Sequence, residues 1–223
     1  MESTALADPL PRMDRAQSPR SDKRERILDA ASAVFARDGY HRARVSDIAR
    51  EANIAYGLVY HYFTNKEEIL RTIFEERWSG LLDAVDGVAR SDASVEEKLE
   101  SVAALILDGY RVRPDWVKVV VLDILRTARF ADPGQLRAVG RLFQLVARIV
   151  RDGQAAGVLR PDLDPGLACS AFLGALELVI TSRVLDLVET RSAAGGPSEP
   201  DRSTARTVVD ILLHGLQTGA RPR

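Results

Sequence analysis

Residues 45–70 read VSDIAREANIAYGLVYHYFTNKEEIL, and the apolar residues in this segment recur at helical spacing. We predict a short helix over about 46–52 and a second one over 54–63. Asn53 between them tolerates the backbone reversal that ends the first helix. Asn65 can cap a third and longer helix through its side chain. Two short helices joined by a tight turn predict a helix-turn-helix, whose second helix enters the major groove of DNA.

The residues before this segment predict one more helix of the same domain. Ile27, Leu28, Ala31, Val34 and Phe35 follow the spacing of one buried helical face. Ser21 or Asp22 can cap that helix, Gly39 can stop it, and Ser46 can cap the next one. Residues 1–21 contain three prolines and no apolar periodicity, so we expect a disordered arm.

The residues after this segment predict only helices, which makes the expected fold all-α. The helix that begins after Asn65 runs to about residue 88. Further helical patterns cover about 95–112, 115–130, 135–156, 165–188 and 202–216. The predicted organisation is a helix-turn-helix domain over 22–68 and a larger helical domain over 69–218.

Composition and charge exclude several classes of protein. The formal net charge is -1, yet residues 12–66 hold eleven basic and seven acidic residues, which suits a segment that meets phosphates. Cys169 is the single cysteine, and three scattered histidines offer neither a catalytic constellation nor a metal site. We expect no enzyme, cofactor or metal. No stretch stands out as a membrane span or a signal peptide, so we expect a cytoplasmic location and no membrane partner.

Three runs carry a resemblance to a known family. They are Phe35-Ala-Arg-Asp-Gly-Tyr, Val45-Ser-Asp-Ile-Ala, and Gly57-Leu-Val-Tyr-His-Tyr-Phe-Thr-Asn-Lys-Glu-Glu-Ile-Leu. Their order and spacing resemble the DNA-binding domain of TetR family transcriptional regulators. The resemblance implies a homodimer that binds a palindromic double-stranded DNA site and responds to a small molecule. Its DNA-binding residues would be Arg42, Arg44, Ser46, Tyr56, Gly57, Leu58, Tyr60, His61 and Lys66.

Individual roles also follow from the resemblance. Tyr60 and Lys66 would contact phosphates, and His61 would face bases or nearby backbone. This sequence departs from the common family pattern at Leu58, where a serine or threonine is frequent, and at Arg44, where a threonine is frequent. Leu58 can contact a thymine methyl group instead.

The resemblance also implies roles for the C-terminal helices. The last two helices would form the dimer interface, with Gly174, Ala175, Val208, Ile211 and Leu212 in it. A pocket between the middle helices would be lined by Leu105, Ile106, Tyr110, Trp116, Val120, Ile124, Phe143, Phe172, Leu176 and Ile180. Such a lining favours an apolar ligand. Residues 55–63 and 172–179 are similar to fatty-acid-metabolism regulators that respond to acyl-CoA, and a repressor is the expected activity.

Two alternatives to the specific regulator stay open at this point. One is a small-molecule carrier or sensor that does not bind specific DNA. The other is a protein that binds DNA without regard to sequence. A footprint on the promoter beside the gene separates them, because only the regulator protects a palindrome. Each predicted pocket residue can also be an ordinary core residue.

Overall fold

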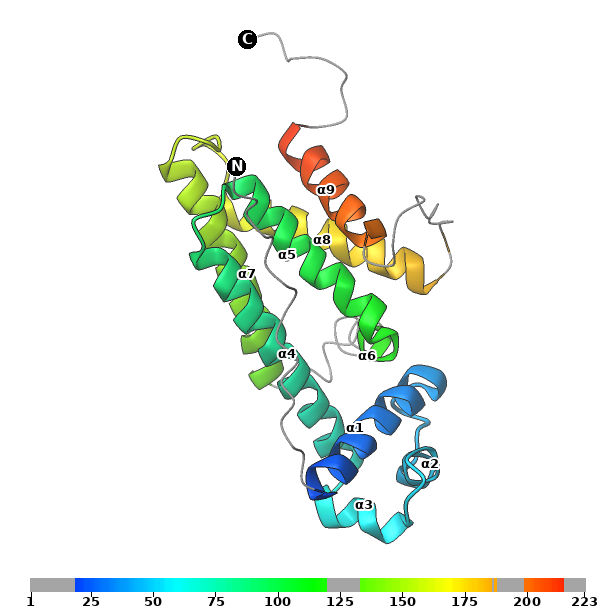
Figure 1. The fold of residues 1–223 in the computed structure, drawn as a ribbon. Helices are drawn as coiled ribbons and strands as arrows, with labels where there is room; N and C mark the ends of the chain where they lie inside the picture. The colour runs from blue at the N-terminus through cyan, green and yellow to red at the C-terminus, as the bar shows by residue number, and fades with distance from the viewer. Residues whose placement is uncertain (1–18, 120–132, 186, 188–198, 215–223) are drawn as a thin grey trace, which may run out of the picture.

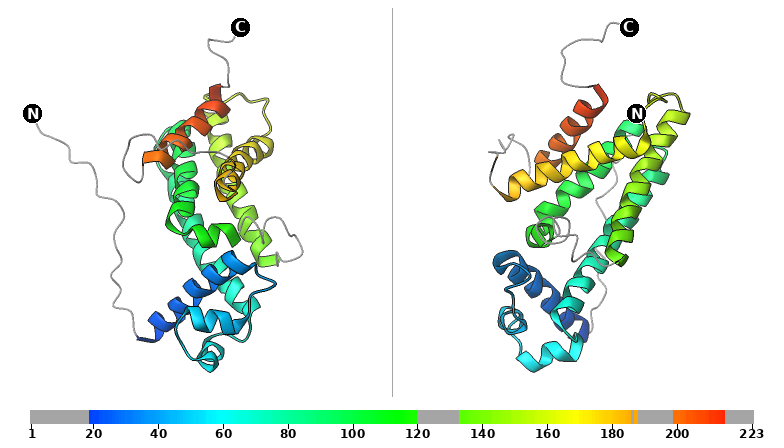
Figure 2. Two further views of the ribbon diagram at one scale, coloured as in Figure 1. Left: turned by 90° about the vertical axis from the view of Figure 1, so that its right-hand side faces the viewer. Right: turned by 180° about the vertical axis from the view of Figure 1, so that it is seen from behind.

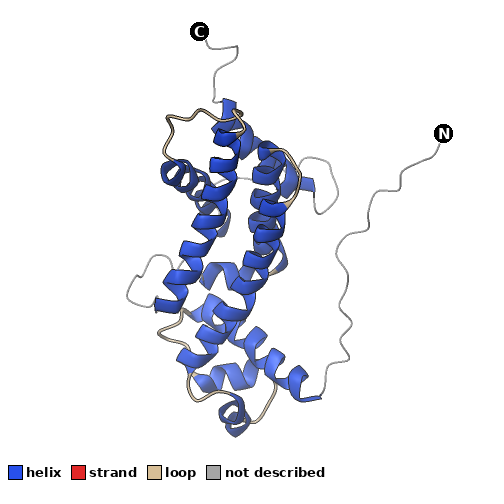
Figure 3. Ribbon diagram, turned by 90° about the vertical axis from the view of Figure 1, so that its left-hand side faces the viewer, coloured by secondary structure: helices blue, strands red, loops and turns tan. Residues whose placement is uncertain are grey.

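The computed structural model describes residues 19–119, 133–185, 187 and 199–214, and within these ranges the regular structure is entirely helical (Figure 3). The N-terminal helices are α1 (Pro19–Asp38), α2 (Val45–Glu51), α3 (Tyr56–Tyr62) and α4 (Lys66–Arg90). The helices that follow are α5 (Val95–Val112), α6 (Pro114–Val119), α7 (Pro133–Ala155), α8 (Pro165–Val184) and α9 (Glu199–His214). The all-α prediction is confirmed.

Local residue chemistry explains most helix ends. Gly39 follows α1 with a φ of 77°, and Asn53 follows α2 with a φ of 52°, a backbone region that glycine and asparagine adopt most readily. Asn65 accepts a hydrogen bond from the amide of Glu68 at 2.8 Å, as predicted for the start of α4. Ser94 forms a capping box with Glu97 at the start of α5.

Two predicted helix starts were wrong, one predicted stop also starts a helix, and one predicted helix lies mostly outside the described residues. Ser46 is not a cap, because α2 begins one residue earlier and Arg44 is the N-cap residue without a side-chain bond. Helix α1 begins at Pro19, inside the segment expected to be a disordered arm, and residues 1–18 lie outside the described ranges. Pro114 ends α5 as predicted and also starts α6, because proline fits the first turn of a helix. The predicted helix over 115–130 is described only as far as Val119.

The helices form two packed units, which are joined by α4 and by the packing of α6 on α1. Helices α1 to α3 lie together at one end of the molecule, and α4 runs from that end along α7 (Figures 1 and 2). Helix α5 packs on α4, α6, α7, α8 and α9, and α9 lies at the end away from α3 (Figure 1). The predicted domain boundary after residue 68 falls inside the first turn of α4, whose Ile69 and Phe74 are buried in the same continuous core.

Helix α8 is the most apolar helix of the described ranges. It is long and apolar enough, by length and composition alone, to cross a membrane, which corrects the expectation that no such stretch exists. It nevertheless packs against α5, α7 and α9, with Cys169, Phe172 and Leu176 buried. We therefore describe α8 as a helix of the bundle.

Candidate nucleic-acid interface and internal cavity

Helix α3 is held by its buried side and presents aromatic hydroxyls on its exposed side. Val59 is fully buried and Phe63, which follows the helix, is 3% exposed. Tyr56 and Tyr60 are 53% and 46% exposed, and their hydroxyl oxygens lie 3.0 Å apart in a hydrogen bond. This bond is the main cause that raises the pKa of Tyr60. The helix thus offers two exposed phenol hydroxyls to a partner molecule.

The other predicted DNA-binding residues surround α3. Gly57 and His61 are exposed on α3, while Leu58 is half-buried. Ser46 is exposed on α2, which packs directly on α3. The structure thus brings these residues together at the end of the molecule farthest from α9 (Figure 1). Their contacts with DNA stay a prediction.

The two predicted arginines differ in their surroundings. Arg42 is exposed and donates from Nε to the carbonyl oxygen of Asp38 at 2.8 Å, which ties its side chain to the end of α1. Arg44 is exposed immediately before α2, and within the described ranges its guanidinium carries no bond. Arg44 is therefore the more available of the two cations for a phosphate.

Lys66 is the first residue of α4, and its ammonium group bonds within the protein. Its Nζ donates to the carbonyl oxygens of Tyr40 at 3.0 Å, His41 at 3.2 Å and Ala43 at 3.2 Å. It also lies 4.6 Å from the centroid of the Tyr40 ring, where a cation is attracted to the aromatic face. An ammonium group has three N–H donors, and all three have acceptors here. Lys66 thus fastens the segment between α1 and α2 to the start of α4, and its contact with phosphate stays a prediction.

Tyr40 completes this junction from the inside. It is 6% exposed and packs edge-on against Phe35 at a centroid distance of 5.3 Å. Burial, together with a hydrogen bond to Glu67, raises the pKa of Tyr40 well above its ordinary value. The loop that precedes α2 is therefore anchored by a buried aromatic ring and by a lysine placed over it.

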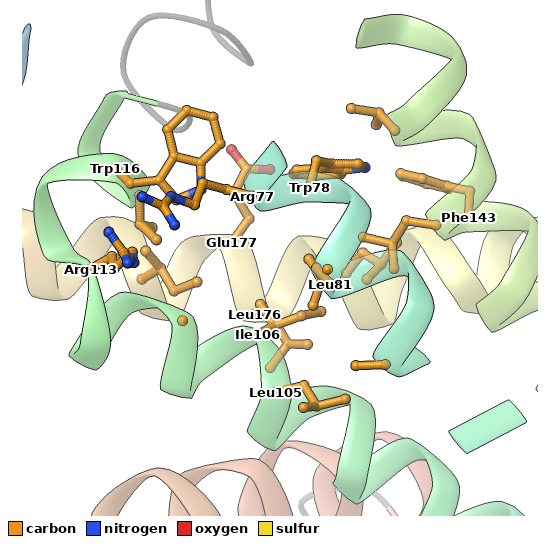
Figure 4. A pocket seen from close by; sticks show the side chains of 18 of the residues that line it. Arg77, Trp78, Leu81, Leu105, Ile106, Arg113, Trp116, Phe143, Leu176 and Glu177 are labelled. Carbon is orange, nitrogen blue, oxygen red and sulfur yellow. The ribbon is translucent and has the colours of Figure 1, made fainter. Parts of the chain in front are cut away.

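A second feature is a half-open cavity of about 660 Å³ between the middle helices (Figure 4). Its size lies within the range of small-molecule sites, about 300–1,000 Å³. Apolar side chains from α4, α5, α6, α7 and α8 provide most of its wall. They include Leu81, Leu105, Ile106, Trp116, Val139, Leu142, Phe143, Leu173, Leu176 and Ile180.

The structure brings six of the ten predicted pocket residues into this wall, namely Leu105, Ile106, Trp116, Phe143, Leu176 and Ile180. Tyr110 and Phe172 do not line it. Phe172 is 3% exposed and packs in the core. Val120 and Ile124 lie outside the described residues.

The polar part of the cavity was not predicted from the sequence. Arg77, Arg113 and Glu177 line it beside Trp116, while Leu81, Leu105 and Ile106 lie on the other side (Figure 4). In the sequence, Arg77 stands between the apolar positions of α4 and looks like an ordinary solvent-exposed charge. Arg113 is the C-cap residue of α5. Neither position indicates a pocket residue from the sequence alone. Only the packing of α4 against α5 brings these two arginines together at the cavity wall.

The predicted dimer residues divide into two groups. Ile211 and Leu212 are 41% and 40% exposed on α9, and Gly174 is exposed on α8. Val208 is only 9% exposed, because it belongs to the face of α9 that packs in the protomer's own core, and this prediction is corrected. Ala175 is half-buried.

Exposed leucines on α8 and at its C-cap were not predicted. Leu167, Leu178 and Leu185 are 62%, 64% and 45% exposed. Their separations of eleven and seven residues correspond to whole numbers of helical turns, so they follow one face. Gly174 lies on the same face. The apolar composition of α8 concealed this stripe, because the buried and the exposed sides of the helix look alike in sequence.

The described side chains offer little basis for a catalytic or a metal site. No group of three histidine, cysteine or acidic side chains that could hold a metal occurs within the described ranges. Cys169 is fully buried on α8, and burial raises the pKa of its thiol to about 11. Such a thiol is a poor nucleophile at neutral pH, because the thiolate is the reactive form.

Comparison with known proteins agrees with this geometry. The family described as "Bacterial regulatory proteins, tetR family" matches residues 27–73, which span most of α1, all of α2 and α3, and the start of α4. A curated relative is the fatty acid metabolism regulator protein of Bacillus subtilis, 28% identical over 164 residues, which cover 72% of this chain and 82% of that protein.

Two solved structures extend the likeness to the C-terminal helices. The fatty acid degradation regulator FadR from Bacillus halodurans superposes with a TM-score of 0.75 at 27% identity, covering 90% of this chain and 98% of that one. FadR from Bacillus subtilis, solved in complex with stearoyl-CoA, gives a TM-score of 0.71 at 24% identity, covering 86% and 99%. These relatives are transcriptional regulators and not enzymes.

Proposed function

This chain belongs to the TetR family of bacterial transcriptional regulators, and we propose that it is a repressor that an apolar small molecule releases from DNA. It acts in the cytoplasm as a homodimer on a palindromic site. Tyr56, Gly57, Leu58 and His61 of α3 face the bases and the nearby backbone in the major groove, and Tyr60 of the same helix contacts a phosphate. Arg42, Arg44 and Ser46 contact the phosphates beside it. No covalent chemistry is involved.

The observation that carries the proposal is that α4 and α6, the helices on which α1 of the DNA-binding unit packs, also supply residues of the cavity wall. Trp116 of α6 lines the cavity and packs edge-on against Phe74 of α4 at a centroid distance of 5.9 Å. Phe74 in turn stacks on Trp78, which lines the cavity as well, at 5.0 Å. Helix α6 also packs on α1. A ligand in the cavity therefore touches the helices on which α1 rests.

This arrangement supports control by a shift of populations. A ligand that fits the cavity better in one placement of α4 and α6 raises the population of that placement. Because α1 packs on both helices, the same change moves the recognition helix of each protomer. The ligand acts only to the extent that it binds the two placements with different affinity.

The ligand class follows from the cavity wall and from the relatives. The wall is mainly leucine, isoleucine, valine and aromatic side chains, which favour an aliphatic chain. The Bacillus subtilis FadR structure holds stearoyl-CoA, and the curated relative regulates fatty acid metabolism. We therefore propose a fatty acyl compound, with acyl-CoA as the first candidate.

The homodimer is supported by the exposed apolar faces of α8 and α9. Leu178 of α8 and Leu185 at its C-cap, with Ile211 and Leu212 of α9, would otherwise stay in water. Large apolar side chains gathered on adjacent packed helices are typical of an interface between subunits. Gly174 on the same face of α8 leaves room for close approach, since no atom lies within 4 Å of the position of its missing Cβ. Two copies joined there match the twofold symmetry of a palindrome.

The test is binding of the purified protein to the DNA upstream of its own gene, with and without dodecanoyl-CoA. We expect a protected palindrome that dodecanoyl-CoA releases. Ile106→Trp fills the cavity and should keep DNA binding but lose the response. Val158→Trp, at a residue 67% exposed and outside the cavity wall, is the matched control and should respond normally. Specific DNA binding that none of a series of acyl compounds changes would disprove the ligand class.

A further inference from the structure

Two arginines of the cavity wall also hold helix α1. Nη2 of Arg77 on α4 donates to Oε1 of Glu25 at 2.5 Å and to Oδ1 of Asp29 at 3.1 Å. Nη1 of Arg113, at the end of α5, donates to the same Oδ1 of Asp29 at 2.7 Å. Glu25 and Asp29 are four residues apart on α1, so they lie on one helix face. Neither of these carboxylates lines the cavity.

The guanidinium groups retain capacity for another anion. A guanidinium has five N–H donors, and these ion pairs use one nitrogen of each arginine. The side chains of Arg77 and Arg113 are 21% and 41% exposed, so a small anionic group can reach them. Figure 4 shows both guanidinium groups together at one side of the cavity, next to Trp116.

We propose that this side of the cavity binds the anionic group of an otherwise apolar ligand, and that this anion competes with Asp29 of α1 for Arg77 and Arg113. The inference rests on the proposed function, because it takes the cavity as the site of the effector. A carboxylate or a phosphate suits the planar, two-pronged donor geometry of arginine. The apolar remainder of the ligand lies along Leu81, Leu105 and Ile106.

Charge balance favours exchange over simple addition. Arg77 and Arg113 face Glu25 and Asp29 on α1, and Glu177 lines the cavity on the same side (Figure 4). Glu25 and Asp29 already pair with the two guanidinium groups, and Glu177 adds a third negative charge at the cavity wall, so a further anion added to all of them would be repelled. An anion that takes the place of the Asp29 carboxylate leaves the local charge unchanged. Release of Asp29 removes the bond from Arg113 to α1 and weakens the hold of Arg77.

This exchange gives the ligand an effect on the DNA-binding unit. Asp29 lies on α1, which packs on α2 and α4 in that unit. The bonds from Arg77 and Arg113 join α1 to α4 and to the end of α5. An anion that breaks them binds more tightly to the placement in which α1 is released, which is the differential affinity that a population shift requires. A neutral ligand of equal size fills the cavity without this effect.

The experiment compares matched anionic and neutral ligands by calorimetry. Decanoate and decanol test a carboxylate, while decanoyl-CoA and the decanoyl thioester of N-acetylcysteamine test the phosphates. The proteins are wild type, Arg113→Gln, Arg113→Lys and Asp29→Asn. Arg148→Gln is the control, since Arg148 is a half-exposed arginine paired with Asp152 on α7, away from the cavity wall. DNA affinity is measured for each protein with and without each ligand.

We expect wild type and Arg148→Gln to prefer at least one anionic ligand over its neutral match by about tenfold or more, the effect of a charge-assisted pair. Arg113→Gln should lose that preference, and Arg113→Lys should recover part of it. Asp29→Asn should bind the anion several-fold more tightly and bind DNA more weakly without ligand. The preferred pair identifies the anion as a carboxylate or a phosphate.

Three results would overturn the inference. The first is equal binding and equal DNA release by anionic and neutral ligands, which would leave the proposed function intact. The second is an anion preference that Arg113→Gln and Asp29→Asn leave unchanged, which would place the anion elsewhere. The third is no binding of any of the four ligands, which would overturn this inference and also the acyl ligand class of the proposed function.

Discussion

Replacement of Lys66 by methionine separates a structural lysine from one that binds phosphate. Methionine keeps a similar apolar stem but removes the ammonium group, which donates to three carbonyl oxygens and lies over the Tyr40 ring. The bonds to Tyr40 and Ala43 are partly buried, whereas the bond to His41 is exposed. Water can replace the exposed bond, so the loss comes mainly from the other two.

The size of the effect follows from these contacts. A hydrogen bond whose partner is left partly buried costs about 1 kcal/mol on average, which gives about 2 kcal/mol for the two carbonyls. The lost interaction between the cation and the ring adds about 0.5 kcal/mol. We therefore expect Lys66→Met to lower the free energy of unfolding by about 2–3 kcal/mol in urea titrations. Lys23→Met, at an exposed lysine of α1, should change it by less than about 0.5 kcal/mol.

The dependence of DNA affinity on salt concentration tests whether Lys66 contacts a phosphate. Each phosphate contact that is lost reduces the slope of log affinity against log salt by about 0.9, or nearly twice that for a homodimer. Because the three N–H donors of Lys66 are occupied, we expect the slope to be unchanged while the affinity falls at every salt concentration. A smaller slope with full stability would refute the structural role and support the phosphate contact predicted from sequence.

Three further predictions test the fold. Gly153→Ala should lower the free energy of unfolding by about 1 kcal/mol, since the new Cβ would lie 2.8 Å from Cγ2 of Val95. Gly140→Ala in the same helix meets no atom within 4 Å and should raise the free energy of unfolding by up to about 1 kcal/mol. Equal gains for both variants in urea titrations would contradict this. Asn53→Ala should cost about 1 kcal/mol and Asn53→Gly almost nothing, because residue 53 has a φ of 52°; equal losses in thermal unfolding would show that the asparagine side chain matters instead. Cys169 should resist alkylation by iodoacetamide in the folded protein from pH 7 to 9. The pKa of its buried thiol is about 11, so the reactive thiolate forms only as the pH approaches that value. Rapid alkylation without unfolding would mean that the thiol is exposed.

Local sequence determined the secondary structure and the DNA-binding unit. Caps and stops such as Asn65, Gly39 and Asn53 act within one turn of their own position, so their effect is readable from neighbouring residues. The apolar spacing of α1 to α4 is equally local. The same holds for the exposed tyrosines of α3, whose place follows from helix periodicity once Val59 is buried.

The tertiary structure decided which side chains of distant helices meet. The bonds of Lys66 to the loop before α2 join residues about 25 apart, and those of Arg113 to Asp29 join residues 84 apart. No local pattern distinguishes these cations from solvated ones. Helix α8 is apolar on most of its circumference, so sequence could not separate the cavity wall at Leu176 from the exposed stripe at Leu178. Helical periodicity assigns residues to faces, but the packing of whole helices alone determines what each face meets.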